Sequence, residues 1–135
     1  MVPFLEIAMM EEKFNVAWEG PVCVFTIKGR IGKEEIRRLA LRQAGIEQGT
    51  HPEIMIVNLL EADYSDISPR DISLVIAHTF TDASENPEMK LAIAATDPHV
   101  VRMCEYYLST MSKLDMRWEV GIFGTMAEAR AWIGA

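Results

Sequence analysis

The sequence IMIVNLLEADYSDISPRDIS, residues 54–73, decides how this chain is interpreted. It begins as a short apolar run, continues as an acidic loop, and reaches Ser68-Pro69, a pair that commonly opens a helix. The helix would therefore start at the carboxyl end of a buried strand, where open α/β sheets commonly carry their binding sites. This order predicts the position of a functional site without naming a reaction.

Strand-like and helix-like segments alternate along the rest of the chain. Two strand-like runs, at 13–18 and 22–28, are joined by a Glu-Gly-Pro turn, which predicts an amino-terminal β-hairpin. Further strands are expected at 54–60, 89–95 and 118–123, and helices at 32–48, 69–80, 98–112 and 126–133. Short apolar strands that alternate with helices favour parallel pairing, with helices on both faces of the sheet.

The expected architecture is a single α/β domain that spans residues 1–135. Its sheet is mixed and mostly parallel, with about five strands and about four helices. The run VCVFTIK at 22–28 carries β-branched or aromatic residues on both faces. Such a strand is expected inside the sheet rather than at an edge.

Composition excludes several classes of partner. The chain of 135 residues is large enough to bury a core, and its net charge is −7. That charge argues against nucleic-acid binding, because phosphate contacts need clustered Lys and Arg. No apolar stretch approaches the roughly 20 residues that span a bilayer, so stable membrane insertion is not expected. Cys23 and Cys104 are too few for a disulfide framework, and both are expected to be buried free thiols in a reducing cytoplasm.

The first ten residues, MVPFLEIAMM, form an apolar arm. The arm lacks a basic region and is interrupted by Glu6, so it does not have the pattern of a secretory signal. We expect it to pack on the domain or on a second subunit, which makes a homodimer plausible.

No catalytic signature is present, so neither enzyme activity nor a cofactor is expected. The segment Gly29-Arg30-Ile31-Gly32-Lys33 resembles a phosphate-binding loop only superficially. Its glycines are too close together, and Glu34 stands where a Ser or Thr would coordinate magnesium. No G-x-S-x-G motif supports a nucleophilic serine.

Metal binding and receiver-type phosphotransfer are also disfavoured. His51, His78 and His99 fall in separate elements, with no cysteine spaced to join them, so no metal site is predicted. Receiver-type phospho-acceptor domains need an aspartate at the end of the central strand. Asn58 stands in the central strand here, which excludes that chemistry.

Four segments carry a resemblance to a known family. They are VFTIKGRIGKEE (24–35), IMIVNLLEADYSDIS (54–68), LAIAATDP (91–98) and WEVGIFGTMAEARAWI (118–133). In their order and short motifs they resemble the STAS domains, most closely the SpoIIAA-like branch. The resemblance implies a non-enzymatic regulatory module of the anti-sigma-factor-antagonist type, which binds a protein partner in the cytoplasm.

The resemblance also implies a phosphorylation switch. In typical members an Asp-Ser pair opens the helix after the central strand, and a partner kinase phosphorylates that serine. Here Ile67 separates Asp66 from Ser68, and Pro69 replaces the usual glycine, which puts the switch in doubt. Ser68 also suffices as a plain helix cap. The candidate phospho-acceptor or partner-binding residues are Asp63, Ser65, Asp66, Ser68 and Asp97.

A small apolar-ligand or lipid carrier is the alternative function. The SpoIIAA-like branch is similar in fold to the CRAL-TRIO lipid-binding domains, so an apolar pocket is conceivable. The candidate lining residues are Val75, Ile76, Phe80, Met103, Tyr107 and Met111. The same helical spacing is expected of any helix that faces a core, so ordinary core packing competes with this hypothesis.

Overall fold

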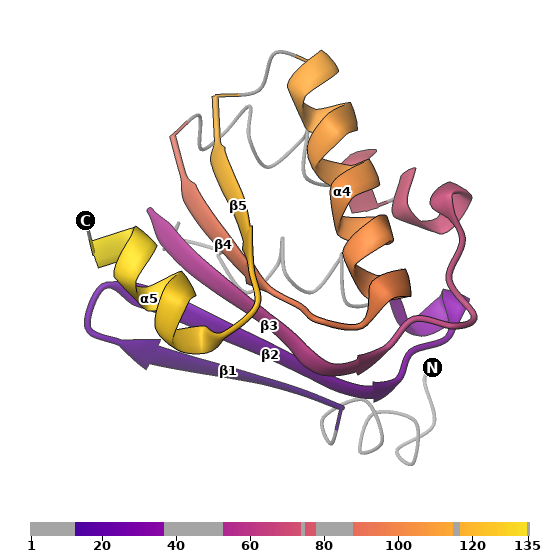
Figure 1. The fold of residues 1–135 in the computed structure, drawn as a ribbon, viewed down its shortest axis with the longest axis horizontal. Helices are drawn as coiled ribbons and strands as arrows, with labels where there is room; N and C mark the ends of the chain where they lie inside the picture. Colours follow the sequence, from indigo (N-terminus) through magenta and orange to yellow (C-terminus); the bar gives the residue numbers. More distant parts are fainter. Residues whose placement is uncertain (1–12, 37–52, 74, 78–87, 115–116, 135) are drawn as a thin grey trace, which may run out of the picture.

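The computed structural model describes residues 13–36, 53–73, 75–77, 88–114 and 117–134. Five strands form one sheet in the order β1-β2-β3-β4-β5 (Figure 1). Their bounds are Phe14–Glu19 (β1), Val22–Arg30 (β2), Ile54–Asp63 (β3), Lys90–Ala94 (β4) and Glu119–Phe123 (β5). β1 pairs antiparallel with β2, and all other neighbours pair in parallel. The predicted α/β class, mixed five-stranded sheet and amino-terminal hairpin are confirmed.

The hairpin turn forms where the sequence predicts it. Gly20 has a φ of +62°, a left-handed conformation that glycine adopts at low cost. Strands β2 and β3 both run further than predicted, because their ladder continues as far as the pair Arg30–Asp63. The loop after β3 is correspondingly shorter than the sequence suggests.

The two complete helices are α4 (Pro98–Lys113) and α5 (Met126–Gly134). Residues 33–36, 69–73 and 75–77 are also helical. The helices predicted to start at 32 and 69 therefore begin within one residue of the expected positions. The remaining residues of those two predicted helices lie largely outside the described part of the chain.

Helices cover both faces of the sheet, as predicted, but unequally. α4 lies on one face and α5 on the other (Figure 1). The four parallel strands lie side by side in chain order, and right-handed crossovers place the connections of such a sheet on a single face. Among the described helices, the opposite face is therefore left to α5, which follows the last strand.

The strand order never reverses within this sheet. Open α/β sheets bind ligands in the crevice that forms where the strand order reverses. This sheet has no such crevice, so the general rule does not by itself make the end of β3 a site. Whether the loop after β3 forms a binding site therefore depends on its own contacts.

The alternation along β2 divides the core into two clusters. Cys23, Phe25 and Ile27 belong to the larger cluster, on the α4 face, where Phe25 stacks on Phe14 with ring centroids 5.7 Å apart. The smaller cluster beneath α5 consists of Val24, Ile56, Ala92 and Ala129. Because β2 has neighbours on both sides and buries residues on both faces, the prediction of an interior strand is confirmed.

α5 is held on its face of the sheet by small residues and by one lysine. Ala92 and Ala129 are both completely buried, and their short side chains let the helix approach the sheet closely. Lys90 donates from Nζ to the Trp132 carbonyl at 2.9 Å and lies 4.6 Å from the centroid of the Trp132 ring. The last carbonyls of a helix lack partners within the helix and attract cations, so Lys90 caps the end of α5.

Strand β3 contains a β-bulge beside Asn58. Thr26 of β2 pairs with Asn58, but Lys28 pairs with Glu61, so β3 has one extra residue between the two pairs. The Leu60 N–H donates to Asn58 Oδ1 at 3.1 Å. The extra residue changes the phase of the strand, and as a result Leu59 and Ala62 both face the larger core cluster.

Three further expectations can be compared with the structure. Cys23 and Cys104 are both buried free cysteines, as predicted. In the part of the chain that the structure describes, no helix is long and apolar enough to cross a membrane. The apolar arm at 1–10 lies outside the described residues, so a homodimer through this arm and the single-domain assignment of 1–135 stay predictions.

Asn58→Ala is expected to lower the free energy of unfolding by about 1 kcal/mol, because the Leu60 N–H at the bulge loses its acceptor. Asn58→Asp keeps an oxygen in the same position and is the matched control. Urea unfolding of the purified variants at neutral pH measures the difference. An unchanged midpoint for Asn58→Ala would contradict the role assigned to this side chain.

Candidate functional site

The acidic loop, defined as residues 61–71, comprises the last residues of β3, the connection at 64–68 and the first turn of the next helix, at the carboxyl edge of the parallel strands (Figure 1). The end of β2 at Arg30 and the start of α4, after β4, lie at the same edge, because parallel strands all end there. His99 Nε2 of α4 hydrogen bonds to the Ile67 carbonyl at 2.9 Å. The five predicted loop and helix-start residues are therefore brought to one edge: Asp63, Ser65, Asp66, Ser68 and Asp97.

The first turn of the acidic loop is organised by Asp63. Its Oδ1 accepts from the Ser65 N–H at 2.9 Å and from the Ser65 hydroxyl at 2.7 Å. The hydrogen bond from the Ser65 side chain and the one from its backbone lower the pKa of Asp63 below its usual value. Asp63 is thus an exposed carboxylate held in a fixed orientation by a local turn.

The tip of the acidic loop is tied to β2 by a bidentate ion pair. Arg30 donates from Nε to Asp66 Oδ2 at 2.7 Å and from Nη2 to Asp66 Oδ1 at 3.0 Å. These hydrogen bonds lower the pKa of Asp66. Both side chains are exposed, so the pair orients the loop more than it stabilises the fold. The sequence analysis did not include Arg30 in the site, although a basic residue at the end of a strand adjacent to an acidic one indicates such a pair.

Ser68 does not cap the helix in the way that the sequence suggests. Asp71 Oδ2 accepts from the Ser68 N–H at 2.8 Å and from the Ser68 hydroxyl at 3.0 Å. Asp71 is the capping group, because its carboxylate reaches back to the first residue of the turn, as in one half of a capping box. The Ser68 hydroxyl only donates to this carboxylate, and it is half-buried beside it.

Ile67 occupies the position directly after Asp66. Its side chain is 3% exposed and belongs to the larger core cluster. Its backbone is also engaged, since the Ile67 N–H donates to the Tyr64 carbonyl at 2.9 Å. The middle of the acidic loop is therefore an anchor that faces the core.

Asp97 caps the start of α4. Its Oδ1 accepts from the backbone N–H groups of His99, at 3.0 Å, and Val100, at 3.2 Å. This satisfies two of the N–H groups that a helix leaves free at its start. The carboxylate predicted to belong to the site is therefore present at the edge but already has a structural role.

The arrangement at this edge favours recognition over catalysis. Ser65 and Ser68 each donate both the hydroxyl and the backbone N–H to a single carboxylate, and among the described residues neither hydroxyl is hydrogen bonded to a histidine. Within the described residues, no group of three or more His, Cys, Asp or Glu side chains is placed to hold a metal ion. His51 and His78 lie outside those residues. What the edge presents is a set of oriented negative charges.

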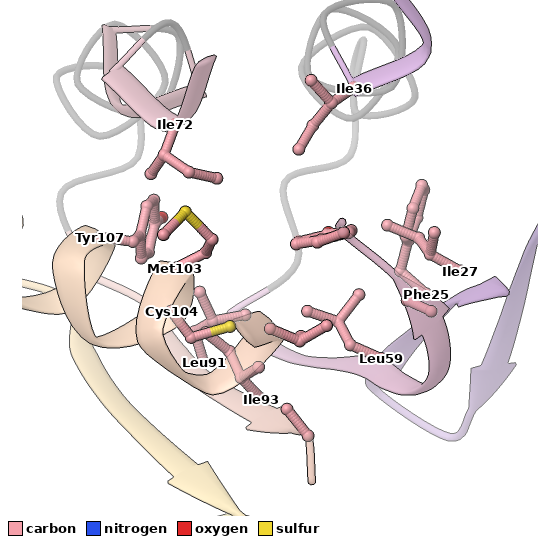
Figure 2. Packing of buried hydrophobic residues seen from close by; sticks show 14 of the residues in the cluster. Phe25, Ile27, Ile36, Leu59, Ile72, Leu91, Ile93, Met103, Cys104 and Tyr107 are labelled. Carbon is pink, nitrogen blue, oxygen red and sulfur yellow. The ribbon is translucent and has the colours of Figure 1, made fainter. Parts of the chain in front are cut away.

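A cavity lies where the sequence predicted an apolar pocket, and it is lined by some of the predicted residues. This cavity of about 90 Å³ lies between the sheet and the helices, and Val75, Met103 and Tyr107 are among its lining residues. Ile76 and Met111 are buried in the core but do not line it, and Phe80 lies outside the described residues. Figure 2 shows the surrounding side chains pointing toward one another from strands and helices.

Comparison with known proteins places the chain by its fold. No protein-family model and no curated protein matches the sequence. An anti-sigma factor antagonist from Mycobacterium paratuberculosis matches with a TM-score of 0.64 at 15% identity, over 90% of this chain and 93% of that chain. This chain has the fold of an anti-sigma factor antagonist. The antagonist SpoIIAA in its unphosphorylated form also matches, with a TM-score of 0.58 at 13% identity, over 90% and 96% of the two chains. The SpoIIAA-like fold expected from the sequence is confirmed.

Asp71→Ala is expected to lower the free energy of unfolding by about 1 kcal/mol, because the Ser68 N–H loses its acceptor. Ser68→Ala should cost less, since it removes only a hydroxyl that donates to the same carboxylate. Asp71→Asn keeps an acceptor oxygen and is the control. Thermal unfolding of the three variants measures the order, and an equal or larger loss for Ser68→Ala would show that serine is the cap after all.

Proposed function

We propose that this chain is a non-enzymatic regulatory module that binds a protein partner through the acidic loop and the start of α4. We further propose that it binds without a serine phosphorylation switch. The fold of two anti-sigma factor antagonists, matched over 90% of this chain, supports the regulatory class. The proposed binding surface is supported by the acidic loop itself, which exposes carboxylates to solvent and buries an apolar side chain in the core.

The acidic loop suits recognition because its charged side chains are already ordered. Asp66 is held by two hydrogen bonds from Arg30, and Asp63 by two from Ser65. A surface that is ordered before binding loses less conformational entropy when the partner arrives. Its negative charge favours a partner with a basic contact surface, since complementary charge speeds association and selects the partner.

The absence of a switch follows from the position after Asp66. In the family that this chain resembles, the regulatory serine directly follows an aspartate, whereas Asp66 is followed by Ile67, which is 3% exposed and has no hydroxyl. The neighbouring Ser68 donates its hydroxyl to the buried Asp71 carboxylate. A phosphate on Ser68 would place two like charges side by side, which opposes the modification.

A lipid carrier is the less favoured function. Ligand pockets commonly have volumes of about 300 to 1,000 Å³. The cavity has about 90 Å³, which is too small for a lipid chain. A cytoplasmic location and a homodimeric state, both expected from the sequence, remain predictions.

Asp66→Lys is expected to weaken partner binding about tenfold, which corresponds to about 1.4 kcal/mol. The change reverses a charge on the proposed surface and breaks the pair with Arg30. Glu119→Lys, an exposed residue at the start of β5 and therefore at the opposite edge of the sheet, makes the same change of charge and is the control. A partner captured from the native cell is purified, and its dissociation constant is measured with both variants. Equal weakening by the two variants would contradict a specific role of the acidic loop.

Incubation of the chain with that partner and ATP is expected to leave the protein unphosphorylated and the complex intact. Intact-mass spectrometry measures the phosphate, and size-exclusion chromatography measures the complex. A phosphate on Ser65 or Ser68 that releases the partner would overturn the proposed absence of a switch.

A further inference from the structure

The cavity lies directly inside the acidic loop, between the sheet and the helix layer. Its walls include Phe25, Leu59, Leu91 and Ile93 from the strands, with Ile72 and Met103 from the helices (Figure 2). Its volume is about 90 Å³, and none of the lining residues in the described part of the chain is charged. The cavity therefore favours apolar ligands over charged ones, because a buried charge without a partner is strongly unfavourable.

Tyr64 gives this apolar cavity a polar group. It follows β3 directly, lines the cavity and is 6% exposed. No hydrogen bond to its hydroxyl is formed by the residues that the structure describes. A tyrosine hydroxyl is protonated at neutral pH and is available as a donor, and burial raises the pKa of Tyr64 still further above its usual value. A buried donor without an acceptor is unfavourable, and an acceptor brought in by a ligand would relieve this.

Water is a poor candidate for that acceptor. A buried water commonly makes about three hydrogen bonds. Besides Tyr64, the described lining residues that carry hydrogen-bonding atoms are Met103, Cys104 and Tyr107, and the sulfur atoms of the first two are weak hydrogen-bonding groups. An apolar molecule with a single acceptor oxygen matches these walls better than water does.

The volume limits the size of such a molecule. An engineered apolar cavity of about 150 Å³ holds benzene. At about 90 Å³, this cavity is smaller. By that comparison its occupant is smaller than benzene, which has six non-hydrogen atoms.

We propose that this cavity binds one small neutral molecule, such as a short ketone or ester fragment, whose oxygen accepts a hydrogen bond from the Tyr64 hydroxyl. The site goes beyond the protein-binding function and does not depend on it. It also lies beneath the partner-binding surface, because the Tyr64 carbonyl accepts the Ile67 N–H within the acidic loop.

The test uses two probes of the same shape. Butanone has an acceptor oxygen, and 2-methyl-1-butene has a CH₂ group in its place. Each is titrated into protein labelled with ¹³C at the methyl groups of Ile, Leu and Met. Saturable shifts are expected for both probes at Leu91, Ile93 and Met103, which line the cavity.

Tyr64→Phe is expected to weaken butanone binding roughly threefold to tenfold and to leave the binding of 2-methyl-1-butene unchanged or tighter. Met111→Leu, a volume-conserving change at a buried residue outside the lining, should alter neither affinity. Absence of saturable shifts, or equal weakening of both probes by Tyr64→Phe, would overturn the proposal.

The folding of the variant provides a second measurement. Without ligand, Tyr64→Phe is expected to melt at or above the temperature of the unmodified protein, because it removes a buried hydroxyl that has no partner among the described residues. A lower melting temperature would show that the hydroxyl has a structural partner, and the premise of the site would then be wrong.

Discussion

The bulge in β3 is the constraint on which the rest of the structure depends. β3 is the middle strand of the sheet, with parallel neighbours on both sides and core clusters on both faces. An extra residue in such a strand has to be accommodated within the strand itself. Asn58 makes this possible, because its side chain accepts the Leu60 N–H that the ladder leaves free. Beyond the bulge the side chains of β3 still alternate between the two faces of the sheet, but the alternation is shifted by one residue.

The shifted alternation determines the two sides of the acidic loop. After the bulge, Ala62, Tyr64 and Ile67 face the core, whereas Asp63, Ser65 and Asp66 face the solvent. The inner side chains anchor the loop, and the outer ones are ordered by Ser65 and Arg30. The same division supports the proposed absence of a phosphorylation switch, because the position after Asp66 belongs to the inner side, where an apolar side chain stabilises the fold. It also buries Tyr64 in the wall of the cavity.

Much of this architecture could be predicted. The predictions that failed concern individual side-chain contacts. The hairpin and the order of strands and helices depend on residues close together in sequence, and they were predicted correctly. The role of Ser68 was predicted from its residue type, but the contact with Asp71 reversed it from acceptor to donor. Arg30 and His99 were not assigned to the site, because each joins the acidic loop from a different element. Only two of the apolar residues predicted on α4, Met103 and Tyr107, line the cavity, since helical spacing does not show which core positions are left incompletely filled.

By itself the sequence determined the fold class, the sites of the helix starts and the acidic character of the loop after β3. These properties depend on hydrophobic periodicity and on capping, which act over a few residues. Only the tertiary structure decided that Arg30 meets Asp66, that Ile67 turns inward and that Tyr64 closes a cavity. These contacts depend on the pairing register of β2 with β3 and on the bulge, and a shift of one residue there would move every side chain beyond it to the opposite face.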